Sequence, residues 1–240
     1  MAVLNPHISI DCVILGFDSK ELKVLLIERE PINGVPLEGH KLKLPGSLIY
    51  KNEDLDNSAY RTLFELTGLR DIFLKQFAVF GHPNRLSPPE DLAWLRKTTN
   101  NYEIDRVVTI AYYSLIKLTE STRTPKTIWY PVKDLPELIF DHNQIVKKAL
   151  EILRNEIRSK PLCFELLPKK FTIRQMQDVY EAILDESFDN RNFRKKIRPL
   201  KFLVPLPEKE KGVSHKPAQL FRFDRKLYFK YNKNRNGFIL

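Results

Sequence analysis

Two apolar segments near the start of the chain predict a β-hairpin. Residues 8–17 and 22–28 are rich in Val, Ile and Leu, and the polar residues 18–20 between them suit a short turn. Segments rich in β-branched and aromatic residues at 77–80, 106–118 and 127–132 predict three further strands. A helix is predicted among these strands at residues 54–66, where apolar residues recur at helical spacing.

A second long helix is predicted from Asp141 onward. Asp141 and Gln144 have the spacing of a capping box, and the residues that follow place one apolar stripe on the helix: Ile145, Ala149, Leu150, Leu153 and Ile157. Ser159, Lys160 and Pro161 interrupt this pattern. We therefore expect one domain at residues 1–158 and another at 159–240.

The pattern of the second domain predicts two helices joined by a short turn. Residues 163–167 suit one helical turn, and Thr172 with Gln175 forms a capping box before an apolar stripe at helical spacing. Asp189 is a suitable N-cap for a short helix that ends near Pro199. On that helix Phe193 and Ile197 share one face, and the opposite face is basic.

A strand at 203–204, a basic loop at 208–216 and a strand at 220–223 complete the pattern of a winged helix-turn-helix, in which the second helix enters the DNA major groove. Arginine pairs with guanine edges, so Arg191 and Arg194 are the best candidates for base contacts. Lysines more often meet phosphates. The candidate DNA-binding residues are Lys169, Lys170, Thr172, Asn190, Arg191, Arg194, Lys195, Arg198 and Lys216.

The charge distribution agrees with this expectation. The chain of 240 residues has a net charge of +10, but residues 1–159 carry 21 basic and 21 acidic side chains, and residues 160–240 carry 19 and 9. A neutral body with a basic C-terminal part indicates a polyanionic partner, nucleic acid before a membrane surface. A solvated basic surface without a partner is the alternative.

The two cysteines, Cys12 and Cys163, both lie in apolar segments, and their spacing suits neither a disulfide framework nor a zinc site. The N-terminus lacks the features of a signal peptide, and no apolar run approaches the length of a membrane span. We therefore expect a soluble cytoplasmic protein with reduced, buried thiols.

An altered motif runs from the predicted strand end into the first helix. Its residues are Gly46, Ser47, Glu53, Arg61, Thr62, Leu63, Glu65, Leu66, Gly68 and Leu69. The spacing resembles the Nudix box, G-x5-E-x7-R-E-U-x-E-E-x-G-U, where U is aliphatic. Ser47 stands at the glycine position, and Thr62 and Leu66 stand where the resemblance implies metal-binding carboxylates. An ordinary amphipathic helix with an Arg61–Glu65 surface pair is the alternative.

Loss of these carboxylates has a chemical consequence. Mg²⁺ needs several oxygen ligands, and Leu66 offers none while Thr62 offers only a neutral hydroxyl. Glu65 with Glu53 would bind the ion weakly. We therefore expect no catalytic residue, no bound metal and no cofactor in this chain, and hence a protein that is not an enzyme.

The long polar connection at residues 81–105 is a candidate binding loop beside the altered motif. Its side chains and those of neighbouring strand ends supply the candidates for contact with a small-molecule effector: Glu30, Lys43, His82, Asn84, Arg85, Asp105 and Arg106. A solvated surface role is the alternative for each of these residues.

The whole chain resembles the Nudix-related transcriptional regulators. The segments that carry this resemblance, besides the altered box, are 105–112, 141–145, 164–168, 171–177, 180–184 and 190–196. The resemblance implies an α+β protein in which a Nudix α/β/α sandwich precedes a winged helix-turn-helix domain. It also implies a homodimeric repressor that binds double-stranded operator DNA and is released by a small effector.

By resemblance alone the chain is closest to the arabinose-responsive regulators of this family, which suggests control of L-arabinose utilisation genes. An ADP-ribose-responsive repressor of NAD metabolism genes is the first alternative. A residual Nudix pyrophosphatase that uses Glu53 and Glu65 with Mg²⁺ is the second. An RNA-binding or scaffolding role is the third, although scaffolding would favour apolar residues where Arg191, Arg194 and Lys195 lie.

Overall fold

The computed structural model describes residues 3–31, 40–99, 103–214 and 216–232. The chain folds into two compact units, one of Met1–Gly16 with Lys23–Leu150 and one of Phe17–Leu22 with Glu151–Leu240. This division falls inside helix α3 (His142–Ser159), earlier than the boundary expected at 158/159. Helix α3 itself ends at Ser159, directly before the predicted interruption by Lys160 and Pro161.

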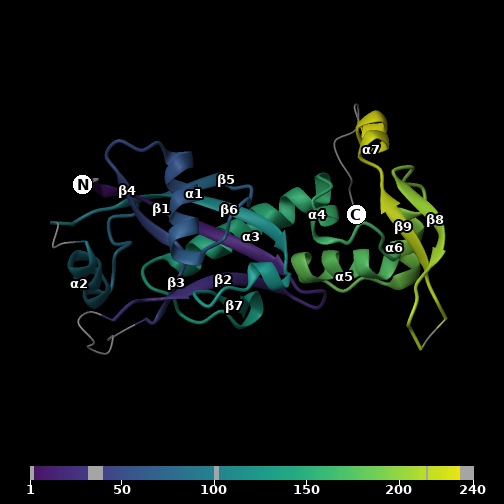
Figure 1. Ribbon diagram of the computed structural model, residues 1–240, viewed down its shortest axis with the longest axis horizontal. Coiled ribbons are helices and arrows are strands. Elements are labelled where there is room, and N and C mark those ends of the chain that lie inside the picture. Colours follow the sequence, from purple (N-terminus) through teal and green to yellow (C-terminus); the bar gives the residue numbers. More distant parts are fainter. Residues whose placement is uncertain (1–2, 32–39, 100–102, 215, 233–240) are drawn as a thin grey trace. The chain divides into compact units, whose positions relative to one another are not determined.

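Among the described residues, the first unit is built on a mixed sheet of seven strands in the order β3-β2-β1-β6-β5, with β4 paired to β1 and β7 paired to β2 (Figure 1). The predicted hairpin and the three later strands are all confirmed. The bounds are β1 Leu4–Phe17, β2 Leu22–Glu28, β3 Leu42–Lys43, β4 Gly46–Tyr50, β5 Lys75–Phe80, β6 Val108–Lys117 and β7 Ile128–Pro131. Two 3-10 turns, Glu120–Thr122 and Val132–Asp134, flank β7.

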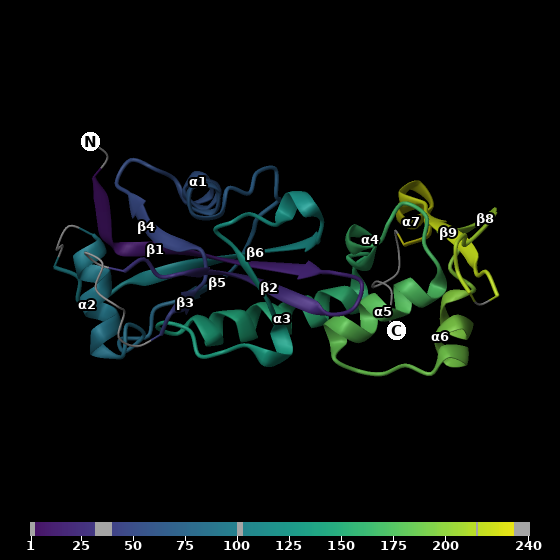
Figure 2. The same ribbon diagram turned by 60° about the horizontal axis from the view of Figure 1, so that its bottom comes forward.

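Helices α1 (Leu55–Thr67) and α3 lie on opposite faces of the sheet (Figure 2). Buried Ala59 and Leu63 of α1 pack in one cluster with Ile10, Cys12 and Ile14, alternate residues of β1 that share a face. Because successive side chains of a strand point to opposite faces, Asp11 is directed away from α1. The first unit is thus the expected α/β/α sandwich.

The segment at residues 81–105 is not the long loop expected from the sequence, because it contains helix α2 (Pro89–Thr98). Proline near the helix start, acidic residues in the first turn and basic residues in the last all favour this helix. Trp94 of α2 is 9% exposed, and its indole Nε1 donates to the backbone oxygen of Glu30 over 3.1 Å. Packing of Trp94 therefore fixes the helix against the end of β2.

The second unit contains the predicted helices and the two wing strands. The bounds are α4 Cys163–Leu166, α5 Ile173–Leu184, α6 Asn190–Ile197, β8 Leu203–Lys209, β9 Gln219–Phe223 and a final helix, α7 Arg225–Asn232, that the sequence pattern did not predict. An isolated antiparallel bridge joins Phe171 to Phe221. Phe164 stacks on Phe223 with ring centroids 4.0 Å apart, so aromatic rings form much of this core.

Two further expectations concern burial. Cys12 and Cys163 are both free and fully buried, as predicted. Burial raises the pKa of the Cys163 thiol to about 12, which keeps it protonated at neutral pH. Within the described ranges, no helix combines the length and the apolar character needed to cross a bilayer.

Candidate effector cavity and DNA-binding surface

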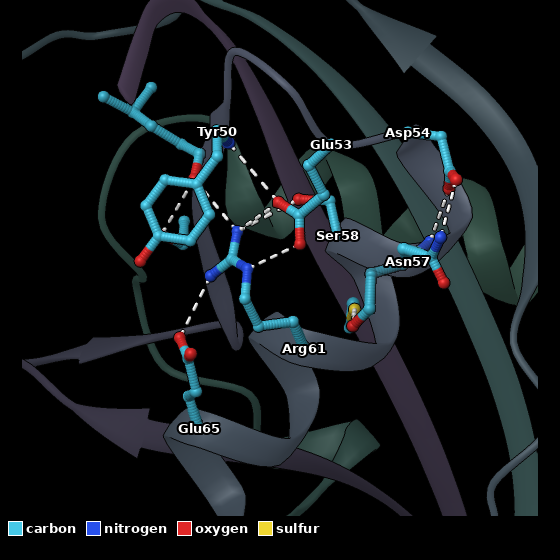
Figure 3. A network of polar contacts seen from close by, with 11 residues as sticks. Tyr50, Glu53, Asp54, Asn57, Ser58, Arg61 and Glu65 are labelled. Carbon is cyan, nitrogen blue, oxygen red and sulfur yellow. Dashed lines mark hydrogen bonds and ion pairs between the residues drawn. The ribbon is translucent and has the colours of Figure 1, made fainter. Parts of the chain in front are cut away.

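The altered box forms a closed ion-pair cluster at the start of α1 (Figure 3). Arg61 donates to both carboxylate oxygens of Glu53, from Nε over 2.7 Å and from Nη2 over 2.8 Å, and its Nη1 lies 3.0 Å from Glu65 Oε2. Its guanidinium also lies 4.2 Å from the centre of the Tyr50 ring. Hydrogen bonding to Arg61 lowers the pKa of Glu53. Both carboxylates that remain in the box, Glu53 and Glu65, are therefore hydrogen-bonded to Arg61.

The two substituted positions of the box do not face a metal site. Thr62 is fully buried, and its hydroxyl has no hydrogen-bond partner in the part of the chain that the structure describes. Leu66 packs against the α1 core cluster and lines a cavity. In the described ranges no group of three or more His, Cys, Asp or Glu side chains is placed to hold a metal ion. The residues present do not fit the Mg²⁺ that a Nudix box implies.

A cavity of about 750 Å³ opens in the first unit beside the box. Three of the predicted effector residues, Glu30, Lys43 and Arg85, line it. The other four, His82, Asn84, Asp105 and Arg106, are exposed and lie outside its lining. His82 accepts a hydrogen bond from the Asn84 backbone N–H over 3.2 Å, so these two form a surface turn, and Arg106 donates outward to the Gly81 carbonyl over 3.1 Å.

The floor of this cavity contains two polar residues that the sequence analysis missed, Asp11 and His142. Asp11 is 4% exposed, and burial raises the pKa of its carboxyl group although Arg85 acts in the opposite direction. Burial lowers the pKa of His142 to about 3, so its ring is neutral at physiological pH. The Leu44 backbone N–H donates to His142 Nδ1 over 3.0 Å, which leaves the ring proton on Nε2, 3.4 Å from Asp11 Oδ1.

Arg85 is held by a second carboxylate behind the floor. Its Nε and Nη2 donate to the two oxygens of Asp141 over 3.0 and 2.8 Å, whereas its distance to Asp11 Oδ2 is 3.5 Å. The side chain of Asp141 is thus paired with Arg85. The Gln144 backbone N–H donates to the backbone carbonyl of Asp141 over 2.9 Å. The residue expected to begin a capping box at the start of α3 thus also forms a buried ion pair with Arg85.

Gly46 allows the floor to form. Its Cα pairs with that of Asp11 across strands β1 and β4, and a Cβ atom at this position would lie 1.9 Å from Asp11 Oδ1. Lys43, three residues earlier, donates from Nζ to the Gly46 carbonyl over 2.8 Å. Asp11 carried a signal in the sequence, since it is a single charge inside the apolar segment 8–17.

In the second unit, α6 has the predicted amphipathic form. Phe193 and Ile197 are 2% and 1% exposed, whereas Arg191, Arg194, Lys195 and Arg198 are all exposed. The carboxylate of Asp189 accepts from the Arg191 and Asn192 N–H groups over 3.1 and 2.9 Å, which confirms its role as the N-cap. One face of this short helix is therefore core, and the other presents four of the predicted DNA contacts.

The turn between α5 and α6 depends on two residues that the sequence analysis did not select. Gln177 is 2% exposed and donates from Nε2 to the Phe188 carbonyl over 2.8 Å and to Glu181 Oε1 over 2.9 Å. The same Glu181 oxygen accepts from the Phe188 N–H over 2.9 Å. Asp185 ends α5 with φ of 58°. This network fixes the direction in which α6 leaves the turn.

The remaining predicted DNA contacts differ in availability. Lys169 and Lys216 are exposed, and Lys170 is exposed but pairs with both oxygens of Glu208 over 2.7 Å. Asn190 is exposed and accepts from Arg174 over 3.1 Å. Thr172 is only 2% exposed, and its hydroxyl accepts from the Gln175 N–H over 3.2 Å. Thr172 therefore caps α5, and little of its surface is left for contact with DNA.

The wing is shorter than expected. Strand β8 continues to Lys209, which pairs with Gln219, so the connecting segment begins at Glu210 and not at Glu208. Glu210 then closes the loop, because its backbone N–H donates to the Ala218 carbonyl over 2.9 Å. Gly212 adopts φ of 73° at the tip, a conformation that glycine tolerates best.

The architecture defines a class of protein: a Nudix-type sandwich with an altered box, followed by a winged helix-turn-helix domain. Residues 163–223 match the family model of the NrtR DNA-binding winged helix domain. The chain is 27% identical over 227 residues to the ADPR responsive transcriptional repressor NtrR of Acinetobacter baylyi, a match that covers 91% of this chain and 82% of that protein. The chain is thus similar to the Nudix-related transcriptional regulators over both of its units, and its winged helix domain matches the DNA-binding domain of NrtR.

Solved structures support the fold. The crystal structure of Shewanella oneidensis NrtR complexed with a 27mer DNA is similar with a TM-score of 0.66 and 23% identity, covering 92% of this chain and 94% of that one. A MutT/nudix family protein from Enterococcus faecalis is similar with a TM-score of 0.56 and 22% identity, covering 92% and 88%. Both likenesses extend through the two units.

Proposed function

We propose that this protein is a transcriptional repressor that binds operator DNA through α6 and the wing, and that leaves the DNA when an ADP-ribose-type effector enters the cavity of the first unit. The observation that carries the proposal is the presence, in one chain, of an exposed basic helix in a winged helix domain and of a cavity that several charged side chains line. We further propose, from the family resemblance, that it acts as a homodimer on a palindromic operator.

The DNA-binding part of the proposal is supported by the geometry of α6. Arg191, Arg194, Lys195 and Arg198 project from a helix whose opposite face is anchored by Phe193. Recognition helices of winged helix-turn-helix proteins use such exposed side chains on base edges and phosphates. The neutral charge balance of residues 1–159 leaves the basic excess in this unit.

The effector part is supported by the cavity and by the relative. Its volume of about 750 Å³ lies within the range of roughly 300–1,000 Å³ usual for small-molecule sites. The description of the Acinetobacter relative as ADPR responsive supports ADP-ribose as the effector class. The comparisons lend no support to L-arabinose, which rests on resemblance alone, so the alternative effector of the sequence analysis becomes the main proposal.

Hydrolysis is not part of the proposal. Mg²⁺ would have to displace Arg61 from both Glu53 and Glu65, while Leu66 supplies no oxygen. The relative from Acinetobacter baylyi is described as a transcriptional repressor. We therefore propose that the box of this chain holds α1 in place and leaves a bound effector intact.

The test is a DNA-binding titration of the full chain with a fragment from upstream of its own gene, monitored by fluorescence anisotropy. We expect tight binding to this fragment that is lost on addition of ADP-ribose and kept on addition of L-arabinose. Arg194→Glu should abolish DNA binding but keep the affinity for ADP-ribose, because Arg194 belongs to the second unit. Lys147→Glu, an exposed change on α3, is the matched control and should keep both.

Three results would change the proposal. Release by L-arabinose alone would make the protein a sugar-responsive regulator. Failure of the wild-type chain to bind any upstream fragment would remove the repressor function. Mg²⁺-dependent cleavage of ADP-ribose that is lost in Glu65→Gln would restore the residual pyrophosphatase.

A further inference from the structure

We propose that Asp11 and Lys43, at the floor of the cavity, form a subsite for sugar hydroxyls, so that the effector is bound there through a neutral polyhydroxylated ring and not through its phosphates. This inference rests on the proposed function, because it assumes that the cavity is the effector site. It adds which chemical part of the effector the floor accepts. Neither residue belongs to the altered box.

Asp11 has an unusual environment for a buried carboxylate. Its contacts to Arg85 and to the neutral ring of His142 are long, 3.5 and 3.4 Å, and Thr109 supplies one further side-chain hydrogen bond. Arg85 places its shorter contacts on Asp141, at 3.0 and 2.8 Å. A carboxylate offers about four acceptor positions, and burying it without good hydrogen bonds is costly. Asp11 is thus prepared to accept hydrogen bonds from a ligand.

Lys43 supplies the complementary group. Burial lowers the pKa of its ammonium group to about 8, and Asp11 and Glu30 act against this shift. The Gly46 carbonyl accepts one hydrogen bond from Nζ over 2.8 Å, and an ammonium group has three donors. The side chain of Lys43 lines the same cavity as Asp11. The floor therefore offers a positively charged donor and a negatively charged acceptor to one ligand.

A hydroxyl group matches this pair better than a phosphate. A hydroxyl donates one hydrogen bond and accepts others, so neighbouring hydroxyls can donate to Asp11 and accept from Lys43. A phosphate at neutral pH is chiefly an acceptor, and it would stand beside the carboxylate of Asp11, which is itself buried. Repulsion between like charges is strong in such surroundings. Trp94 and Leu86 add apolar wall to the same cavity, which suits the carbon face of a sugar ring.

The test is isothermal titration calorimetry of the full chain with ADP-ribose, ADP and inorganic pyrophosphate. ADP lacks the second sugar of ADP-ribose, and pyrophosphate lacks both. Hydrogen bonds to charged groups contribute roughly 1.5–3 kcal/mol, which corresponds to roughly 10- to 100-fold in affinity. We expect Asp11→Asn and Lys43→Met each to weaken ADP-ribose binding by that factor, and to reduce the preference for ADP-ribose over ADP.

Matched controls make these changes interpretable. Lys41→Met makes the same substitution on the exposed side chain two residues before Lys43, and Asp134→Asn changes an exposed carboxylate. Both should bind ADP-ribose as the wild type does. Thermal unfolding of all variants shows whether each is folded, and Lys43→Met keeps the test valid if Asp11→Asn does not fold.

The sign of the Asp11→Asn effect separates the two ligand chemistries. Tighter ADP-ribose binding in this variant would mean that a phosphate occupies the floor and would overturn the inference, as would unchanged affinity in both variants. Either result leaves the proposed repressor intact. Conversely, if ADP-ribose binds as described but does not release operator DNA, the proposed function fails while the subsite stands. If neither ADP-ribose nor D-ribose nor L-arabinose binds the wild type, both fail.

Discussion

Gly46 shows how a single residue controls the cavity floor. A Cβ atom there would lie 1.9 Å from Asp11 Oδ1 and 2.9 Å from the Ile10 carbonyl, and the second of these neighbours is backbone that cannot rotate away. Glycine is therefore required by close approach of two strands, since Gly46 does not have a positive φ. The position of Asp11 and the pairing of β1 with β4 therefore both require that residue 46 has no Cβ atom.

We expect Gly46→Ala to lower the free energy of unfolding by about 1–3 kcal/mol, the usual cost of overpacking. Affinity for ADP-ribose should also fall, because Asp11 must move. Urea denaturation and calorimetry measure the two effects. Gly81→Ala is the control: its Cβ would lie 3.3 Å from a Val108 methyl group, which can give way. Equal stability of the two variants would show that the strands separate without strain.

Lys43 gives a pH dependence whose sign follows from its lowered pKa. The ammonium form that we expect to bind hydroxyls is lost as pH rises through about 8. ADP-ribose affinity should therefore fall between about pH 7 and pH 9, and Lys43→Met should lack this fall. Calorimetry at several pH values checks this. Affinity that rises over the same range would show that the neutral amine is the binding form.

The same shift affects stability in the opposite sense. Because the folded-state pKa of Lys43 lies near 8 and the ordinary value is 10.5, the unfolded chain binds more protons between these values. Stability contributed by this group therefore rises with pH across that window. The unfolding free energy of the wild type should therefore rise relative to that of Lys43→Met as pH increases from about 8 to 10.5, which chemical denaturation at several pH values measures.

The helices and strands that could be predicted from the sequence are those marked by a local pattern of apolar or capping residues. Alternating apolar residues located β1 and β2, and the capping box of Thr172 and Gln175 located the start of α5. Helix α2 was missed although its proline and its charged ends favour a helix, because Asp91 and Trp94 are its only buried residues and no apolar stripe marks it. Helix α7 was missed because Tyr228 is the one buried side chain in its described part, so no apolar stripe marks it.

The floor of the cavity was only partly predictable for a related reason. Glu30 and Lys43 were selected because they lie at strand ends near the altered box, and Arg85 because it lies in the connection at residues 81–105. Asp11 and His142 lie far apart in the sequence and meet only through strand pairing and the start of α3. The four candidates outside the lining lie in or directly after the same segment as Arg85, and side-chain packing decides which of its residues face the cavity. A local sequence pattern shows which residues are polar, but it does not show whether their side chains point into the cavity or into solvent.

The cap of α5 offers a test at this scale. Thr172 accepts from the Gln175 N–H, and Gln175 Oε1 accepts from the Thr172 N–H over 2.9 Å. We expect Thr172→Ala to destabilise the second unit by about 0.5–2 kcal/mol. Thermal unfolding measures the loss, and Ser187→Ala, an exposed change in the following turn, should be neutral. A neutral Thr172→Ala with weakened operator binding would instead make Thr172 a DNA contact.

For the whole molecule, the uneven charge makes a prediction about salt. Each neutralised DNA phosphate contributes about −0.9 to the slope of log affinity against log salt concentration. We expect a steep slope for operator binding, reduced by about one unit in Lys169→Ala if that lysine meets a phosphate. Lys147→Ala, in the neutral part of the chain, should leave the slope unchanged. A flat salt response would remove nucleic acid as the partner.

The hold of Arg61 on Glu53 and Glu65 has a consequence for signalling under the proposed function. An enzyme with this fold would destroy the molecule that it recognises, and its occupancy would report the rate of supply. A protein that returns the molecule unchanged is at equilibrium with it, so its occupancy reports concentration alone. The same arginine that closes the box thereby makes gene expression reversible as soon as the metabolite level falls.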